Sequence, residues 1–386
     1  MKIARAIIRD ISNFYGWYCI SLIVWFLLAG EEVITYLKFA DKINIINYEA
    51  FLMSNKKTAA ALICTSLLSG TAFADTMTIK LATDTGSPDT PQGESLQKLA
   101  EIIESRTKGT DDEIDVQVFY GGELGDQKEV FDLHIVGEID MMINFPMTSY
   151  DSRMGVRNVP YMFVDWDQAL DAYKPGGWLN TIYQDIYSDN GLRFFGAYPE
   201  GFAGVATADS YATNISEANN TKVRVTANFP NPSTLGAMGY TPVPMTFGEV
   251  YTSIQTGVVD GDAGNNIYWT YSYFKDVIDY YVDTRHYFVT AAISMNEKSW
   301  EDLDDNQKSI VAEAAEVISR EQFENAQKTD AEYRKKAGNA GIKYIDLTEE
   351  QMSSMANEVR SDVWPILDKE YPKSLKQAIM ENAPAI

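Results

Sequence analysis

The chain has 386 residues, of which 55 are acidic and 32 are basic, and its formal net charge is −23. So acidic a chain is unsuited to bind nucleic acid or anionic lipid, because like charges repel. Its two cysteines, Cys19 and Cys64, both lie before residue 75. This excludes a disulfide scaffold or a thiolate metal site in the remainder.

The first 74 residues have the pattern of an export segment rather than of a folded domain. Residues 53–74 begin with Met53 and two lysines, continue with an apolar run of about eleven residues and end in Ala-Phe-Ala, which is the order of a cleaved secretory signal. We interpret residues 1–52 as an extension that arises from a start codon assigned too early, so that Met53 would be the true first residue. The second apolar run, at 16–30, leaves a membrane anchor as the alternative. The mature chain would begin at Asp75, lie in the periplasm and carry a formal charge of −25, because seven basic and five acidic residues precede it.

Strand and helix patterns alternate in the first half of the mature chain. In residues 93–109 the apolar side chains recur at helical spacing, and a second helical pattern at 125–137 stops at Gly137. Residues 113–120 alternate in polarity as a half-buried strand does. Residues 138–145 form an apolar run typical of a parallel strand buried on both faces. The alternation predicts an α/β fold with parallel strands.

The second half continues the pattern and adds one long helix. Short strand patterns occur at 191–201, 221–227 and 257–262. Residues 303–338 keep a helical pattern that would span about 50 Å, enough to lie across two lobes. We expect its buried stripe to consist of Ile310, Ala314, Val317 and Ile318. No linker-like segment interrupts the chain, so we expect two lobes between which it crosses more than once.

Residues suited to catalysis or metal binding are scarce. The only histidines are His134 and His286, and both are interpreted as structural. No metalloprotease motif, nucleophile elbow or phosphate-binding glycine loop occurs. We interpret Asp165–Asp167 as solvated residues at a helix start. The segment Asp260–Asn266 resembles a calcium loop only faintly, because it lacks the oxygen ligand before glycine and the distant glutamate. The sequence therefore predicts no enzyme, metal or cofactor.

One strand carries a candidate anion-binding arginine. In residues 221–227, Val223 and Val225 face one side, while Arg224 faces the other and lies near the carboxyl end, where α/β sheets gather ligands. A guanidinium pairs with both oxygens of a carboxylate. Taken alone, the pattern fits a surface arginine better than a binding residue.

A capped helix follows this strand. Thr246 and Glu249 have the spacing of a capping box, and Gly257 is placed to end the helix. Phe247 lies in the first turn, where it can serve as a hydrophobic plug or as the wall of a pocket.

The stretch "GYTPVPMTFGEVYTSIQTGVVDG" (239–261) resembles the signature of the solute-binding proteins of TRAP transporters, the DctP-like family. Supporting matches are "GGELGDQKEVFDLHIVGEIDM" (121–141), "VPYMF" (159–163) and "KVRV" (222–225), so the resemblance covers nearly all of 75–386. It implies an α/β fold of two lobes joined by crossing segments, a long helix that braces both, and a ligand cleft between them. We divide the lobes as 75–201 with about 292–330, and 202–291 with about 331–386.

The resemblance also implies site residues. It implies an organic anion held by Arg224, with contacts from Phe247 and from an asparagine after the signature. That asparagine is Asn265 or Asn266, because "DGDAGNN" departs from the family pattern. Many relatives carry a second arginine about twenty residues before the first, where this chain has Ala203 and Gly204. The nearby aromatic residues Phe145, Phe202 and Trp269 are further candidates, and each also fits a core position.

These observations predict a periplasmic binding protein that captures a small carboxylate or sulfonate and delivers it to TRAP membrane subunits. With one arginine fewer than many relatives, a monoanion or zwitterion is expected rather than a dicarboxylate. We expect Arg224→Ala to abolish binding and to leave the unliganded fold intact. The alternative is a periplasmic lyase or hydrolase acting on an organic acid, which would need a general base beside the anion site.

Overall fold

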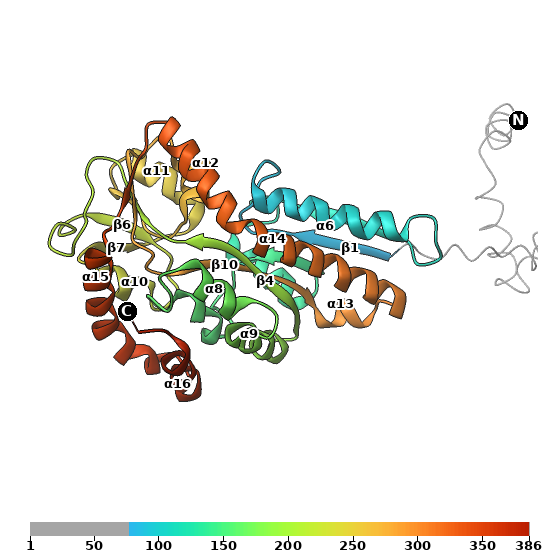
Figure 1. The fold of residues 1–386 in the computed structure, drawn as a ribbon. Coiled ribbons are helices and arrows are strands. Elements are labelled where there is room, and N and C mark those ends of the chain that lie inside the picture. The colour runs from blue at the N-terminus through green and yellow to red at the C-terminus, as the bar shows by residue number, and fades with distance from the viewer. Residues whose placement is uncertain (1–76, 386) are drawn as a thin grey trace, which may run out of the picture. The chain divides into compact units, whose positions relative to one another are not determined.

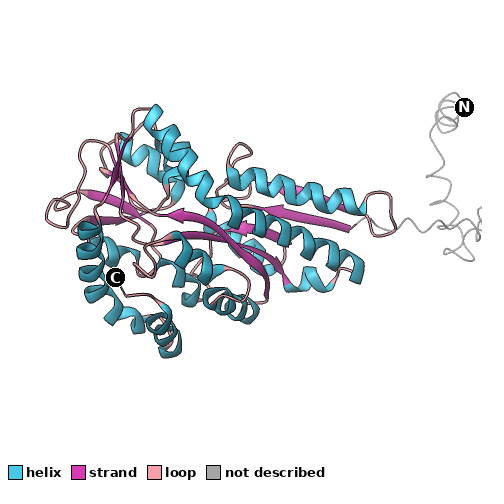
Figure 2. Cartoon of the chain, in the orientation of Figure 1, coloured by secondary structure: helices cyan, strands magenta, loops and turns pink. Residues whose placement is uncertain are grey.

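The computed structural model describes residues 77–385, and the predicted extension and signal segment lie outside the described residues. Two mixed sheets, each flanked by helices, form the fold, which confirms the predicted two-lobed α/β class (Figures 1 and 2). The residue boundaries predicted for the lobes stay a prediction. No helix among residues 77–385 is long and apolar enough to cross a membrane.

The first sheet has the strand order β2-β1-β3-β10-β4. Its strands are β1 (Met77–Ala82), β2 (Ile114–Phe119), β3 (Met141–Asn144), β4 (Leu192–Phe202) and β10 (Phe288–Asn296). The first three are parallel, and β10 runs antiparallel to both β3 and β4. Associated helices are α6 (Pro91–Thr107), α7 (Gln127–Val136), the 3-10 helix η1 (Ser152–Asn158), α8 (Trp166–Tyr173), α9 (Trp178–Asp189) and α13 (Glu297–Glu301).

The second sheet has the order β11-β9-β5-β8-β6-β7. Its strands are β5 (Val205–Thr207), β6 (Lys222–Val225), β7 (Thr241–Pro244), β8 (Gly261–Asp262), β9 (Tyr280–Asp283) and β11 (Lys343–Asp346). Strands β7, β6 and β8 are parallel. The remaining helices are α10 (Asn231–Ala237), η2 (Phe247–Glu249), α11 (Val250–Gln255), α12 (Ile267–Phe274), α15 (Glu349–Val363), η3 (Trp364–Lys369) and α16 (Lys373–Asn382).

The chain crosses between the sheets more than once, as the fold prediction required, and two of the crossings are adjacent. Strand β4 leads into β5 through two residues, and β9 leads into β10 through 284–287. The two crossings are antiparallel neighbours, because Phe202 pairs with Phe288 and Val205 pairs with Val282. Such a narrow double connection is suited to bending of one lobe against the other.

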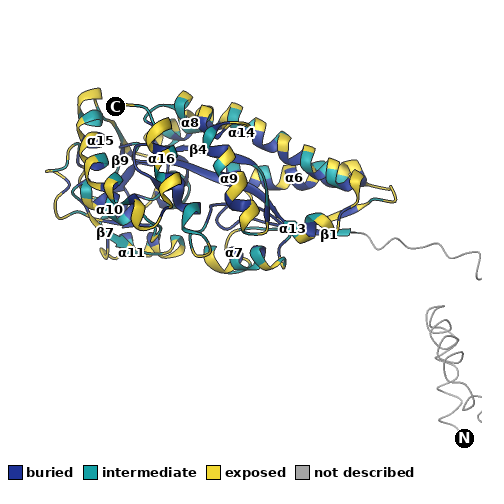
Figure 3. Ribbon diagram, turned by 90° about the horizontal axis from the view of Figure 1, so that it is seen from below, coloured by how far each residue is buried: buried dark blue, intermediate teal, exposed yellow. Residues whose placement is uncertain are grey.

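The long helix α14 (Asp305–Asn339) contacts β4 and α6 of the first sheet region and α12 and β11 of the second (Figure 1). Its outer face is exposed and its inner face is buried (Figure 3). The predicted stripe was wrong at two positions, since Ile310 and Val317 are only half-buried. The buried stripe is one residue further round the helix and includes Val311, Ala314, Ala315, Ile318 and Ala326. Its inner face packs on both sheet regions, so the helix braces them.

Several local predictions are confirmed. Helix α6 buries four apolar residues at helical spacing, Leu96, Leu99, Ala100 and Ile103. Helix α7 ends at Gly137, whose φ of 80° is readily adopted only by glycine. All four residues of β3 are buried, as expected of a strand covered on both faces.

Candidate functional site

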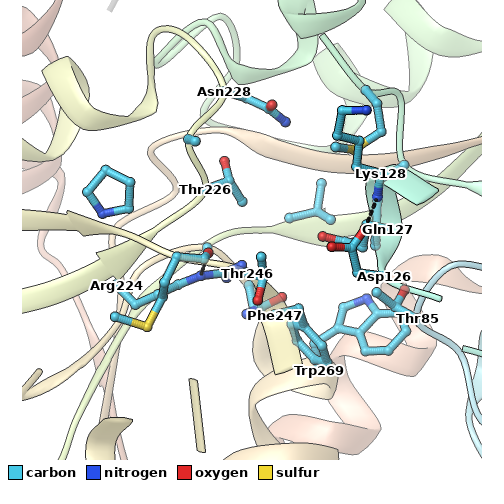
Figure 4. A pocket seen from close by; sticks show the side chains of 18 of the residues that line it. Thr85, Asp126, Gln127, Lys128, Arg224, Thr226, Asn228, Thr246, Phe247 and Trp269 are labelled. Carbon is cyan, nitrogen blue, oxygen red and sulfur yellow. Dashed lines mark hydrogen bonds between the residues drawn. The ribbon is translucent and has the colours of Figure 1, made fainter. Parts of the chain in front are cut away.

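A cavity of about 230 Å³ lies where the carboxyl ends of strands from both sheets meet. Lining residues follow β1, β3, β6, β7 and β8 directly or within a few positions, which is the usual place for ligands in α/β sheets. The lining consists of Thr85, 126–128, Phe145, Met147, Arg157, Arg224, 226–228, 244–247, Gly264, Asn265, Trp269 and Val289 (Figure 4).

Arg224 lines this cavity and is nevertheless 98% buried, so the surface alternative does not hold. In β6 it lies in register with Asp262 of β8. Its Nη1 donates to Asp262 Oδ1 at 3.1 Å, and its Nε donates to the Met245 carbonyl at 3.1 Å. These bonds fix the plane of the guanidinium and leave Nη2 without a partner among residues 77–385.

Asp262 is itself held in place by its neighbours. Its Oδ2 accepts from Asn265 Nδ2 at 2.7 Å and from the Gly264 N–H at 3.3 Å. A Cβ atom on Gly264 would lie 2.5 Å from Arg224 Nη1, so the ion pair requires glycine there. The segment after the signature is therefore a support for Arg224, which sequence reasoning did not anticipate.

Three aromatic rings form one wall of the cavity. Trp269 stands between Phe145, at a centroid distance of 6.0 Å, and Phe247, at 5.9 Å, and both contacts are edge-to-face. The Arg224 guanidinium lies 6.0 Å from the Phe247 ring. Phe247 is placed by the predicted capping box, in which the Glu249 carboxylate accepts from the Thr246 N–H and hydroxyl. The helix starts with a 3-10 turn, η2, before α11.

Five of the seven predicted site residues line the cavity: Arg224, Phe247, Asn265, Phe145 and Trp269. Asn266 does not. It is the N-cap of α12 and bonds to the Trp269 N–H and the Glu200 carbonyl. Phe202 lies in a neighbouring cluster against Trp166 and Phe288 and does not line the cavity.

The structure adds a second arginine to the cavity, so the expectation of a single one is wrong. Arg157 of η1 lines the cavity and is 5% exposed. Its guanidinium lies 4.8 Å from the centroid of Phe145. The position at which many relatives have their second arginine has no room for one here, since Ala203 is fully buried and a Cβ on Gly204 would lie 2.3 Å from the Tyr281 ring. The signal that sequence reasoning missed is an arginine within an apolar stretch just before "VPYMF".

Two buried carboxyl groups lie behind the cavity wall. Burial raises the pKa of Glu200 from 4.5 to about 8, although its Oε2 accepts from Trp269 Nε1 at 2.6 Å. Burial also raises the pKa of Asp84 from 3.8 to about 7. The nearby positive charge of Arg157 lowers both pKa values in part. At neutral pH Glu200 is therefore mainly uncharged.

The remaining candidates for chemistry have structural roles. Each histidine ring is buried with both nitrogens hydrogen-bonded, His134 to Ile139 and Ser294, and His286 to Thr284 and Ala263. Burial lowers both histidine pKa values to about 4, so both rings are neutral. Asp165 caps α8, as predicted. Residues 77–385 contain no group of three or more His, Cys, Asp or Glu side chains placed to hold a metal ion.

Comparison with known families agrees with this geometry. The model of the family described as "Bacterial extracellular solute-binding protein, family 7", or DctP, matches residues 82–370. The chain belongs to this family. It is a family of binding proteins rather than enzymes, and its members include the solute-binding components of TRAP transporters.

Individual members of the DctP family are similar to this chain in sequence and in fold. The ectoine-binding periplasmic protein TeaA of Halomonas elongata is 26% identical over 276 residues, which cover 64% of this chain and 80% of TeaA. A TRAP periplasmic solute binding protein from Shewanella oneidensis, solved with succinate, superimposes with a TM-score of 0.72 at 21% identity, covering 80% of this chain and all of that one. A Chromohalobacter salexigens protein, solved with D-glucuronate, gives a TM-score of 0.71 at 22% identity, with the same coverage.

Proposed function

We propose that this DctP-family protein captures a small organic anion, a carboxylate or sulfonate, in the Arg224 cavity and delivers it to TRAP membrane subunits. The observation that carries the proposal is a buried guanidinium, fixed by Asp262 and the Met245 carbonyl, that lines a cavity of about 230 Å³. A fixed arginine presents a fork of donors that matches two oxyanion oxygens.

The rest of the lining supports a small, partly apolar ligand. The volume of about 230 Å³ lies below the roughly 300–1,000 Å³ of drug-sized sites, so a small metabolite fits best. Phe145, Phe247 and Trp269 provide apolar contact area. Asn265 provides an amide beside Arg224, and it is our choice between the two predicted asparagines.

The relatives define the class of ligand without fixing its identity. Those compared above are named for, or were solved with, ectoine, succinate and D-glucuronate. All three ligands carry at least one carboxylate. A carboxylate near Arg224 is the common element that this cavity can accommodate.

Capture follows from the arrangement of the lobes. The cavity is lined from both sheet regions, which are connected by the two short crossings, by α14 and by the C-terminal segment, whose Tyr371 packs in the first region and bonds to the Phe229 carbonyl of the second. A ligand that contacts both regions favours the closed arrangement, and the membrane subunits would recognise that closed form. We also propose that the protein reaches the periplasm through cleavage after Ala74, which N-terminal sequencing of exported protein tests by finding Asp75 first.

A thermal-shift screen over organic acids and sulfonates tests the proposal. We expect at least one acid to raise Tm and to be recovered unchanged. Arg224→Lys keeps a cation opposite Asp262 but loses the planar fork, so we expect affinity for that acid to fall roughly tenfold or more. Conversion of the acid to a product, or an Arg224→Lys variant that binds as well as the parent, would contradict the proposal.

A further inference from the structure

Arg157 carries a buried charge for which the described part of the chain offers no counterion. The side chain is 5% exposed and lines the cavity. No carboxylate of residues 77–385 forms an ion pair with it, and its buried Nε has no hydrogen-bond acceptor there. The ring of Phe145, 4.8 Å away, offers a cation–π contact but no negative charge. An isolated buried charge is costly, so a bound group of opposite charge is the simplest physical reason for this geometry.

The other cavity arginine differs in this respect. Arg224 and Asp262 are 2% and 1% exposed and form an ion pair at 3.1 Å, so together they are electrically neutral. A ligand can accept hydrogen bonds from Arg224, but its negative charge is not needed there. The positive charge that remains unbalanced in the cavity is that of Arg157.

The nearest buried carboxyl groups do not remove this imbalance at neutral pH. Neither Asp84 nor Glu200 is close enough to Arg157 to form an ion pair. Their oxygens accept hydrogen bonds from other residues. Asp84 accepts from Thr85 and Gln127, and Glu200 accepts from Trp269. Burial raises their pKa values to about 7 and about 8, so both carboxyl groups carry less negative charge at neutral pH than ordinary carboxylates do.

The local structure presents Arg157 to the cavity. Helix η1 starts at the N-cap Asp151, and the Arg157 N–H donates to the Tyr183 hydroxyl at 3.2 Å. Arg153 of the same helix is different, because it pairs with Asp151 and Asp189 and does not line the cavity. It offers a matched control.

We infer that Arg157 is a second anion-binding residue that balances the net charge of the ligand, so that the site selects anions over zwitterions. The inference rests on the proposed function and narrows its ligand class. A zwitterion of zero net charge would leave Arg157 unbalanced. A ligand with a net negative charge can balance the charge of Arg157, which belongs to the first sheet region. It can also accept hydrogen bonds from Arg224, which belongs to the second.

The binding test uses three probes: succinate, D-glucuronate and the zwitterion ectoine. We expect one or both anions to raise the Tm of the parent protein, and ectoine to give no comparable shift. In Arg157→Met, which keeps contact with Phe145, calorimetric affinity for the anion should fall roughly 30-fold or more, whereas Arg153→Met should bind as the parent does. A larger shift with ectoine than with either anion, or anion affinity in Arg157→Met within about threefold of the parent, overturns the inference.

The unliganded protein gives a second readout that needs no ligand. Since Arg157 has no counterion, replacing it by Met should leave Tm unchanged or raise it, while Arg153→Met should lower Tm because it breaks two ion pairs. A fall of several degrees in unliganded Arg157→Met would assign the residue a structural role and overturn the inference. If none of the three probes binds, the Tm of unliganded Arg157→Met relative to the parent decides whether the inference holds.

The two proposals fail in different ways. Acid binding that depends on Arg224 but not on Arg157 leaves the proposed function standing and rejects the inference. If no acid in the broad screen binds, or if an acid is consumed, the proposed function fails and the inference with it.

Discussion

Replacing Arg224 by alanine should destabilise the unliganded protein, contrary to what the sequence alone suggested. The side chain is 2% exposed, and its partner Asp262 is 1% exposed. Alanine removes the guanidinium but leaves the Asp262 carboxylate buried, with only the Asn265 amide and the Gly264 N–H as donors. The variant therefore contains an uncompensated buried charge.

The size of the effect follows from that charge. Removing one member of a buried ion pair costs about 3–5 kcal/mol of unfolding free energy. With an unfolding entropy of about 2.1 cal/mol/K per residue over roughly 310 ordered residues, the loss corresponds to a fall in Tm of roughly 5–8 °C. Adding Asp262→Asn should recover part of the loss, because an amide at this position carries no charge to be buried.

Calorimetric or chemical unfolding of the parent, Arg224→Ala and the Arg224→Ala/Asp262→Asn double variant measures these differences without ligand. The decisive quantity is the coupling between the two sites. If Arg224→Ala unfolds within about 1 kcal/mol of the parent, the ion pair contributes nothing net and the assigned role of Asp262 is refuted.

The remaining predictions concern the same site. Because burial raises the Glu200 pKa from 4.5 to about 8, the folded chain keeps a proton that the unfolded chain has released across this range. Glu200 therefore contributes a fall of about 1.4 kcal/mol per pH unit to the unfolding free energy between these values, and Glu200→Gln should remove this contribution in urea titrations. Ionisation of Glu200 also places a negative charge near the cavity, so the affinity for anions should weaken from pH 6 to pH 9. In Glu200→Gln this weakening should be smaller. Gly264→Ala should lower anion affinity by about tenfold or more by displacing Arg224, with an unchanged circular dichroism spectrum. Asn265→Ala should weaken binding, whereas Asn266→Ala should chiefly lower stability, by about 1 kcal/mol, through loss of the α12 cap. The reverse ranking in calorimetry and urea unfolding would exchange their roles.

Local periodicity was sufficient to predict most elements of the fold, and long-range pairing was not. The 3.6-residue pattern predicted α6, α7 and α14, and only the rotation of the α14 stripe was wrong. The apolar run at 138–145 predicted β3 correctly, but nothing in it shows that its neighbour β10 is antiparallel. That pairing joins segments about 150 residues apart and depends on the path of the whole chain.

The site residues follow the same rule: those marked by a local sequence pattern were predicted, and those placed by long-range pairing were not. Arg224 and Phe247 were predicted from the strand, the capping box and a family resemblance. Asp262 was not, because only the parallel register of β6 and β8 brings it beside Arg224. Arg157 was missed because η1 has no periodic pattern and lies 67 residues before Arg224 in the chain.

The two arginines contribute differently to ligand recognition: Arg224 provides fixed hydrogen-bond donors, and Arg157 provides positive charge. Arg224 is neutralised and fixed by Asp262, so it offers directed donors at little electrostatic gain. Arg157 has no counterion among the described residues, so a negative ligand gains most of its electrostatic energy there. Since the two side chains belong to opposite sheet regions, a ligand that satisfies both stabilises the closed arrangement more than the open one. That difference in affinity is what a population shift between open and closed forms requires. An arginine fixed on one side and an unbalanced arginine on the other therefore couple binding to closure without any reactive group.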